Sequence, residues 1–242
     1  MGVEVIYSDD DIVVINKPPG ISAHGGEAVR GPTVADFLLE KFPEIKDVGD
    51  PSTGSEQVNL RPGIVHRLDK NTSGVMVAAR NQKSFLALKE MFQNRRVEKI
   101  YWAIACGKFK EREGVINLPI GRLINDPRKR GVDITGRERR KIRGEREAMT
   151  EFKVLRQGEV FALVEVRPKT GRMHQIRVHL SAIHHPVACD TVYGGKKVCC
   201  PSKTGRQLLH AASLVFSYPE GRKLNFEANP PEDFTLAAEA IL

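Results

Sequence analysis

Short apolar runs, bounded by turn-forming residues, constrain the fold of this chain most strongly. We expect strands at residues 3–7, 12–16, 75–79, 98–106, 115–120, 150–156, 160–167, 208–218 and 223–228. Runs of this length with Gly, Pro, Asn or Asp between them are typical of β-strands. We expect helices at residues 34–42, 82–94 and 173–183, and Pro231 opens a last short one. Because strands and helices do not alternate regularly, the sequence predicts an α+β fold with a mixed, mostly antiparallel sheet flanked by helices and loops.

The length of the chain and its apolar content set its class. A chain of 242 residues suits one large domain or two small ones. We find no run of about 18 apolar residues that could span a membrane, and the N-terminus carries acids where a leader needs bases. The sequence also shows no internal repeat. We therefore expect one domain over residues 1–242, with room for two lobes, in a cytoplasmic protein without a membrane partner.

The four cysteines indicate neither a zinc site nor a disulfide framework. They are Cys106, Cys189, Cys199 and Cys200. No CxxC pair occurs, and the adjacent pair at 199 and 200 cannot easily bridge itself. His174 and His179 do not have the spacing of a zinc motif either. The sequence predicts reduced thiols and no bound metal.

Basic residues concentrate in one segment, residues 127–147. The net charge of the chain is +8. Between Arg128 and Glu147, nine basic residues stand against four acidic ones, so five of the eight net charges lie here. Three glycines favour a mobile hairpin or loop over a helix. The segment is either a solvated basic loop or, as we prefer, an insertion that contacts the phosphates of a nucleic acid.

The stretch GIVHRLDKNTSG places one acid among cations. Asp69 lies between Arg67 and Lys70, shortly before an apolar run. Neighbouring cations favour the ionised carboxylate, which suits a nucleophile or a base better than a general acid. A helix cap or a surface salt bridge is the simpler alternative. Side chains of Thr72 and Ser73 could hold the loop through hydrogen bonds to the backbone, whereas Ser73 as a nucleophile lacks a GxSxG frame.

Two other segments carry candidate residues. RPKTGRMHQIRVHL is strongly basic, and its Arg177 could pair with a carboxylate or a phosphate through its planar fork. A solvated basic helix face would explain the same pattern. In EKIYWAIACG, Tyr101 and Trp102 point to opposite faces of the expected strand. Tyr101 could simply pack in a core, or it could stack on a nucleobase.

Six segments resemble the RluA family of pseudouridine synthases, and together they span almost the whole chain. They are VINKPPGISAH, HRLDKNTSG, KIYWAIACG, TGRMHQIRVHL, HPVACDTVYGG and LLHAASLVFSYP, in that order. HRLDKNTSG agrees with HRLDxxTSG at every fixed position, and TGRMHQIRVHL with TGRxHQIRxH. The chain departs from the family at His184 and Cys189, where glycines are frequent, and at Tyr218, where histidine is common. The resemblance implies the pseudouridine synthase fold.

The resemblance also implies an isomerase that converts specific uridines of structured RNA to pseudouridine by base flipping, glycosidic bond cleavage and C–C bond formation. The first candidate for this RNA is 23S-type large-subunit ribosomal RNA, and the second is transfer RNA. Asp69 would attack the sugar or remove a proton from it, Tyr101 would stack on the uracil, and Arg177 would pair with Asp69. Arg67 would help fill the space of the flipped nucleotide. The remaining residues expected to bind substrate are His66, Arg172, His174 and Gln175.

By the same resemblance, no metal, cofactor or obligatory protein partner is expected. Many relatives carry a small RNA-binding domain in front, whereas this sequence starts at the first strand of the catalytic domain. We therefore expect no N-terminal S4-like domain and assign RNA contact to the insertion at 127–147. A non-catalytic RNA-binding or ribosome-assembly protein is the main alternative, and a hydrolase that uses Ser73 is another. The presence of Asp69, Tyr101 and Arg177 favours the enzyme.

Overall fold

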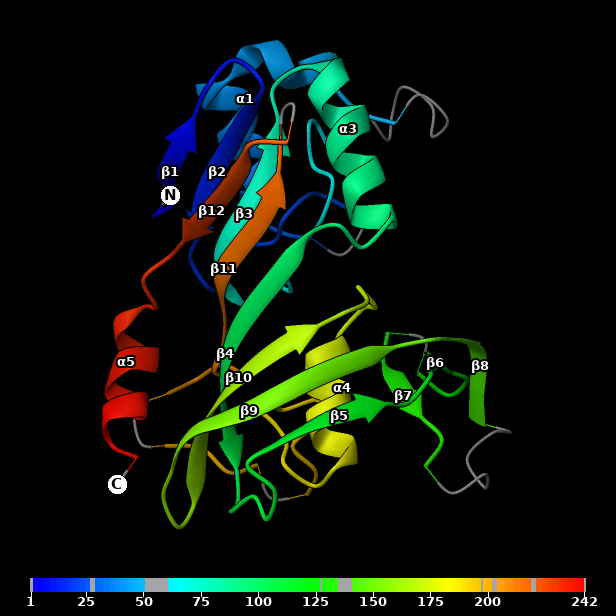
Figure 1. Cartoon of the computed structure of the whole chain (residues 1–242), viewed down its shortest axis with the longest axis vertical. Coiled ribbons are helices and arrows are strands. Elements are labelled where there is room, and N and C mark those ends of the chain that lie inside the picture. The colour runs from blue at the N-terminus through cyan, green and yellow to red at the C-terminus, as the bar shows by residue number, and fades with distance from the viewer. Residues whose placement is uncertain are drawn as a thin grey trace. The chain divides into compact units, whose positions relative to one another are not determined.

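The chain divides into two compact units. A computed structural model describes residues 2–26, 29–50, 61–126, 128–134, 141–196, 198–201, 204–218 and 221–241. The first unit comprises Met1–Glu98 and Ala211–Pro230, and the second comprises Lys99–His210 and Pro231–Leu242. The boundaries fall at the start of strand β4, Glu98–Cys106, within strand β11, Leu209–Ser217, and between Pro230 and Pro231 (Figure 1). The expectation of one domain stays a prediction.

The first unit is built on antiparallel strands with helices around them. Its strands follow the order β1-β2-β3-β11, and β12 also pairs with β11. The bounds are Glu4–Ser8 for β1, Ile12–Lys17 for β2, Ser73–Ala79 for β3 and Lys223–Glu227 for β12. The helical segments are α1 at Val34–Lys41, η1 at Pro43–Asp47 and α3 at Gln82–Gln93 (Figure 1). Lys17, the last residue of β2, pairs with Gly74 near the start of β3. This register fixes where the loop before β3 joins the sheet.

Local sequence signals explain where the helices of the first unit begin. The side chain of Thr33 accepts the backbone N–H of Asp36, and the Asp36 carboxylate accepts the N–H of Thr33 in return. This capping box starts α1 where the sequence predicted it. Asn81 and Ser84 form the same arrangement at the start of α3. The helices bury apolar side chains, among them Leu38 and Leu88. Every residue of strand β3 is buried as well.

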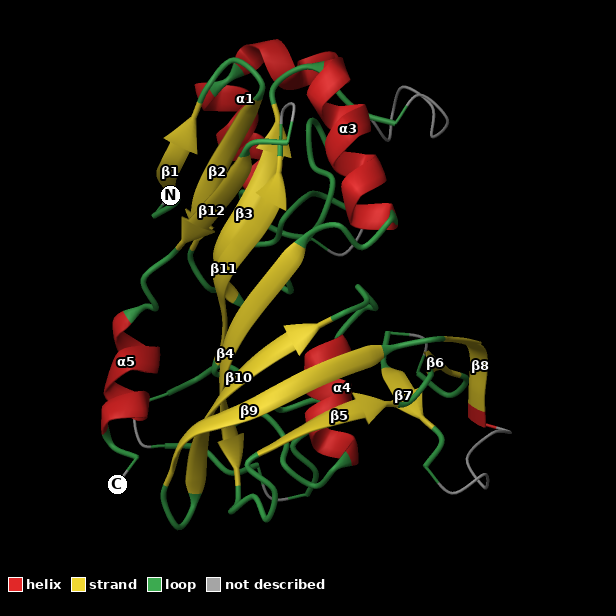
Figure 2. Ribbon diagram, viewed as in Figure 1, coloured by secondary structure: helices red, strands yellow, loops and turns green. Residues whose placement is uncertain are grey.

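The second unit contains a four-stranded antiparallel array in the order β4-β10-β9-β5. The strands are β10 at Phe161–Pro168, β9 at Met149–Gln157 and β5 at Glu113–Asn117, next to β4. Helix α4, Gln175–Ala182, belongs to the same unit (Figure 2). Its Ile176 and Leu180 are buried in a core cluster with Ala105 of β4 and Val164 of β10. Helix α5, Glu232–Glu239, packs through Phe234 in a separate cluster with Ile104. The α+β fold with antiparallel pairing is confirmed.

The predicted single strand at 115–120 is wrong, because the chain forms two strands there. Strand β5 ends at Asn117, and β6 begins at Ile120 and runs to Leu123. Between them stands Pro119, which has no N–H for a ladder and favours a break. Strand β6 lies in the middle of a second, three-stranded sheet in the order β7-β6-β8.

This small sheet contains the described part of the basic insertion. Its outer strands are β7, Arg130–Val132, and β8, Ile142–Arg146, each antiparallel to β6. The predicted hairpin or loop is therefore a pair of strands on either side of β6. Exposed basic side chains include Arg128, Arg143 and Arg146. Arg137, Arg139 and Arg140 lie outside the described residues.

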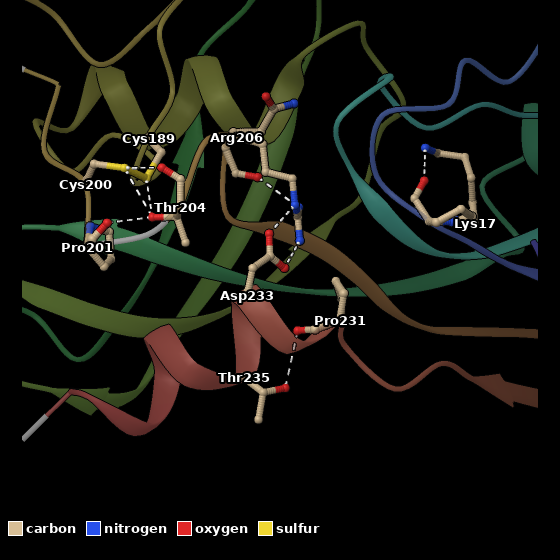
Figure 3. A network of polar contacts seen from close by, with 11 residues as sticks. Lys17, Cys189, Cys200, Pro201, Thr204, Arg206, Pro231, Asp233 and Thr235 are labelled. Carbon is tan, nitrogen blue, oxygen red and sulfur yellow. Dashed lines mark hydrogen bonds and ion pairs between the residues drawn. A yellow bond between two sulfur atoms is a disulfide. The ribbon is translucent and has the colours of Figure 1, made fainter. Parts of the chain in front are cut away.

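The prediction of reduced thiols is wrong, since all four cysteines pair. Cys106 bonds to Cys199, 93 positions away in sequence, and Cys189 bonds to Cys200 (Figure 3). The fold creates these pairs by laying the segment after α4 along β4: Ala188 N–H donates to Ile104 O at 2.7 Å. Sequence spacing could not reveal a pairing that depends on this long-range contact.

Candidate active site

Asp69 lies in the loop that leads into β3, in the first unit. Its side chain is half-buried, while those of Arg67 and Lys70 on either side are exposed. The backbone N–H of Thr72 donates to Asp69 O at 3.0 Å, which closes a turn around the acid. The N–H of Gly20 donates to Lys70 O at 2.9 Å. Backbone bonds at Asp69 itself and at Lys70 therefore define the course of the loop.

Lys17 strengthens this anchoring from within the protein. It is fully buried at the end of β2, and its ammonium donates to three backbone carbonyls. The acceptors are Pro18 O at 2.8 Å, Ile21 O at 2.8 Å and Lys70 O at 3.0 Å. A buried ammonium is costly unless its donors are satisfied, so these carbonyls stabilise the charge and the charge fixes the carbonyls. Lys17 thus connects β2 directly to the residue after Asp69.

The expected clamp by the side chain of Thr72 does not form. Among the buried side-chain nitrogen and oxygen atoms of the described residues, Thr72 Oγ1 is the one without a hydrogen-bond partner. Ser73 is 1% exposed inside β3, which places its hydroxyl in the interior rather than at a reacting surface. The entry into β3 instead depends on Gly74, with φ at +116°, where a Cβ would collide with the carbonyl of Ala211.

Arg67 contacts a histidine that the sequence analysis did not single out. Arg67 Nη1 lies 3.2 Å from His24 Nε2, and His24 Nδ1 lies 2.7 Å from Gly25 O. A proton on Nδ1 satisfies both contacts, because Nε2 then accepts from the guanidinium. Burial lowers the pKa of His24, and Arg61 and Arg67 lower it further. The neutral imidazole therefore orients Arg67 without adding charge to a cationic cluster.

His66 is packed against its own unit. Its Nε2 accepts the backbone N–H of Val77 in β3 at 3.1 Å. Its ring stacks on Phe92 of α3 with centroids 4.5 Å apart. These contacts attach the start of the Asp69 loop to β3 and α3. The side chain is half-buried.

Tyr101 and Arg177 both belong to the second unit. Tyr101 lies on β4 opposite Val166 of β10 and packs at the edge of the core cluster that α4 covers. Trp102 packs in the other cluster with Phe234, as the predicted alternation of faces requires. Arg177 lies in the middle of α4 and is 5% exposed. The predicted site residues are thus divided, with Asp69 in the first unit.

A buried ion pair holds Arg177. Its Nε donates to Asp190 Oδ2 at 2.7 Å and its Nη2 to Asp190 Oδ1 at 2.9 Å, while Asp190 is fully buried. The guanidinium also lies over the ring of Tyr193, with the carbon 5.1 Å from the centroid. Bidentate pairing with a carboxylate fixes both the position and the plane of an arginine. The sequence predicted a carboxylate or a phosphate as the partner of Arg177, and the family resemblance named Asp69 but not Asp190. The pairing with Asp69 stays a prediction.

The remaining candidates lie at the first residue of α4 or just before it. The Gln175 amide is 4% exposed, donates to Met149 O and Thr150 Oγ1, and accepts from Thr170 Oγ1 and the N–H of Arg172. Its hydrogen-bonding capacity is thereby used within the protein. Arg172 donates from Nε to Glu147 O at 2.9 Å. His174 has φ at +57° and places Nδ1 2.8 Å from the hydroxyl of Tyr193.

Sequence reasoning missed four residues that hold the predicted ones: Lys17, His24, Asp190 and Tyr193. All four lie in the segments VINKPPGISAH and HPVACDTVYGG, which carried the family resemblance. Their location in these two segments was the signal that could have identified them. Their partners could not be deduced, because each contact joins segments far apart in sequence.

Comparison with known proteins decides the family. Residues 11–182 match the family described as RNA pseudouridylate synthase. This chain belongs to that family. It is an RNA pseudouridine synthase and therefore an isomerase, and the resemblance to the RluA type is confirmed by relatives named ribosomal large subunit pseudouridine synthase D.

The relatives extend over the whole synthase chain. An uncharacterized RNA pseudouridine synthase of Mycobacterium bovis is 37% identical, with 99% of this chain and 73% of the relative covered. Ribosomal large subunit pseudouridine synthase D of Vibrio parahaemolyticus is 34% identical, with 99% and 70% covered. The solved structure of human RNA Pseudouridylate Synthase Domain Containing 4 has a TM-score of 0.72 at 28% identity, with 98% and 92% covered.

Two further observations concern metals and membranes. The described part of the synthase contains no group of three or more His, Cys, Asp or Glu side chains placed to hold a metal ion. Among the described helices, none is long and apolar enough to cross a membrane. The expectation that the reaction needs no metal stays a prediction.

Proposed function

We propose that this synthase converts uridines to pseudouridine in large-subunit ribosomal RNA, with transfer RNA as the second candidate. The names of relatives from Vibrio parahaemolyticus, Borreliella burgdorferi and Neisseria meningitidis, each a ribosomal large subunit pseudouridine synthase D, support this choice. The exposed basic side chains of β8 and of the β6–β7 connection suit a polyanionic substrate. Such an RNA substrate implies work in the cytoplasm.

The reaction exchanges one bond of the nucleotide for another. The bond between N1 of uracil and C1′ of ribose breaks, the uracil turns, and C5 bonds to C1′. The proton on C5 leaves and N1 gains one, so the product is an isomer. Asp69 is the carboxylate that we assign to this step, either attacking C1′ or removing a proton from the sugar. One observation carries the assignment: Asp69 stands on a loop whose backbone is held at both Lys70 and Thr72.

Tyr101 and Arg177 complete the proposed catalytic set. Tyr101 stacks on the uracil, since it lies at the edge of its core cluster rather than within it. Arg177 pairs with the carboxylate of Asp69 in the complex with RNA, through the guanidinium that Asp190 orients. A uridine inside a helix must be flipped out to reach these groups, and the exposed side chain of Arg67 takes its place in the stack.

The other expected substrate-binding residues fall into two groups. We propose that His66 and Gln175 position the backbone, because their hydrogen bonds run to Val77, Met149 and Thr150. Arg172 and His174 remain candidates for direct contact with RNA, since both are only half-buried.

A tritium-release assay tests the proposed substrate. Formation of the bond at C5 sends the C5 hydrogen to water, so RNA made with 5-tritiated uridine reports each turnover. We expect release from fragments of large-subunit ribosomal RNA at a rate at least 10-fold above that from transfer RNA transcripts, about 1.4 kcal/mol of discrimination. Release from transfer RNA alone would overturn the choice of ribosomal RNA. No release from either RNA would overturn the proposed function.

A further inference from the structure

The segment after α4 carries two residues that converge on Arg177. Asp190 accepts both hydrogen bonds from its guanidinium, and Tyr193 covers its face. Asp190 Oδ1 also accepts the backbone N–H groups of Val192 and Tyr193, at 2.9 and 3.1 Å. One carboxylate therefore fixes the turn and the arginine together. Moving either part would move the other.

Tyr193 also reaches the basic insertion. Its hydroxyl accepts the backbone N–H of Arg130 at the start of β7, at 3.0 Å. The same hydroxyl lies 2.8 Å from Nδ1 of His174, the residue before α4. The ring packs with Val132 of β7 and Val178 of α4. A single side chain thus joins the insertion, the start of α4 and Arg177.

We propose that Asp190 and Tyr193 are positioning residues for Arg177, and that Tyr193 couples RNA contact at the basic insertion to the placement of this arginine. The inference rests on the proposed function, in which Arg177 acts at the site. Asp190 sets the position and plane of the guanidinium. The Tyr193 ring limits its motion, and the Tyr193 hydroxyl ties it to β7. RNA that binds the insertion therefore meets an arginine already aligned.

The chain offers a matched control for Asp190. Arg206 and Asp233 form a second bidentate pair in the same unit, with Nε to Oδ2 and Nη2 to Oδ1 both at 2.7 Å (Figure 3). This pair fastens α5, and its two hydrogen bonds involve none of the proposed site residues. A merely structural role would give Asp190→Asn and Asp233→Asn the same phenotype. Tyr7→Phe is the matching control for Tyr193→Phe, because the Tyr7 hydroxyl is likewise hydrogen-bonded and donates to Asp9 at 2.7 Å.

The test measures kcat and KM by tritium release from ribosomal RNA fragments. We expect Asp190→Asn to lower kcat about 100-fold, since a small misplacement of a reacting group costs this much, while Asp233→Asn changes kcat less than about 3-fold. Tyr193→Phe keeps the ring and should raise KM about 5-fold with little change in kcat, whereas Tyr193→Leu should lower kcat. Tyr7→Phe should change neither.

The outcomes separate this inference from the proposed function. A wild-type protein without turnover refutes the proposed function itself. An active wild type, with equal kcat in the folded Asp190→Asn and Asp233→Asn proteins, overturns the role of Asp190. Unchanged KM in Tyr193→Phe overturns the coupling through its hydroxyl. If Asp190→Asn does not fold, as judged by the fluorescence of Trp102, the comparison of Tyr193→Phe with Tyr7→Phe tests the proposal instead.

Discussion

The loop around Asp69 and the segment around Asp190 are both irregular, but the protein holds them by different means. The Asp69 loop depends on backbone carbonyls gathered around one buried ammonium, that of Lys17. The Asp190 segment depends on an ion pair with Arg177, on the disulfide between Cys189 and Cys200 that joins its two ends, and on the disulfide from Cys199 to Cys106. The first region therefore requires that the Lys17 ammonium keeps its hydrogen bonds. The second region contains a charge pair too, and disulfides restrain it covalently in addition. The difference teaches that a half-buried acid can be positioned through hydrogen bonds to the backbone of its loop, whereas a buried arginine needs a counter-charge.

The largest expected effect comes from the covalent restraint. Cys199→Ser removes the bond to Cys106 that closes 93 positions of chain. In non-reducing buffer we expect a loss of about 4–5 kcal/mol in the free energy of unfolding of the second unit, from loop-closure entropy. Cys200→Ser opens a loop of only 11 positions and should cost about 3 kcal/mol. Urea unfolding followed by Trp102 fluorescence measures both. Equal losses in the two variants would argue against the entropic account.

The next effect breaks the anchor of the first region. Lys17→Met leaves three carbonyls without their donor, which should cost about 3 kcal/mol. Hydrogen exchange of peptides that cover residues 61–72 should accelerate, while that of residues 187–196 should not change. Lys46→Met, at an exposed position of η1, is the control. Exchange that speeds up equally in both segments would show that the two anchors are not independent.

Both units should become less stable as pH falls. Burial lowers the pKa of His24, which contacts Arg67, and that of His179 in α4. Below a pH of about 6.5, the unfolded chain then binds more protons than the folded one. The free energy of unfolding therefore falls as the pH drops from about 6.5 towards the lowered pKa values of the folded state. Above a pH of about 6.5, this contribution to stability is fully present. Titration of unfolding from pH 8 to 5 checks this. His184→Asn, at an exposed position, should leave the profile unchanged; a flat wild-type profile would contradict the prediction.

The smallest effect concerns the hydroxyl of Thr72. Because Oγ1 is buried without a partner, Thr72→Val should be neutral or stabilise the first unit by up to about 1 kcal/mol. Thermal unfolding and tritium release together measure the change. A fall in turnover without a fall in stability would mean that the hydroxyl serves the reaction.

The sequence anticipated the elements better than their contacts. Alternation and turn residues located β4 at its observed bounds, and the helical spacing of apolar residues over 34–42 located α1. The break between β5 and β6 was missed, because the apolar run through Ile116 and Ile120 masked Pro119. Asp190, which pairs with Arg177, was missed for a different reason: pairing between α4 and the segment after it depends on the fold rather than on any local pattern.

The central claim is that this synthase depends on the carboxylate of Asp69. Asp69→Asn and the exposed control Asp47→Asn are incubated with tritiated ribosomal RNA fragments, and the pseudouridine formed is mapped. We predict no detectable pseudouridine with Asp69→Asn, wild-type amounts with Asp47→Asn, and unchanged RNA binding and unfolding in both. Full turnover by Asp69→Asn would contradict the account.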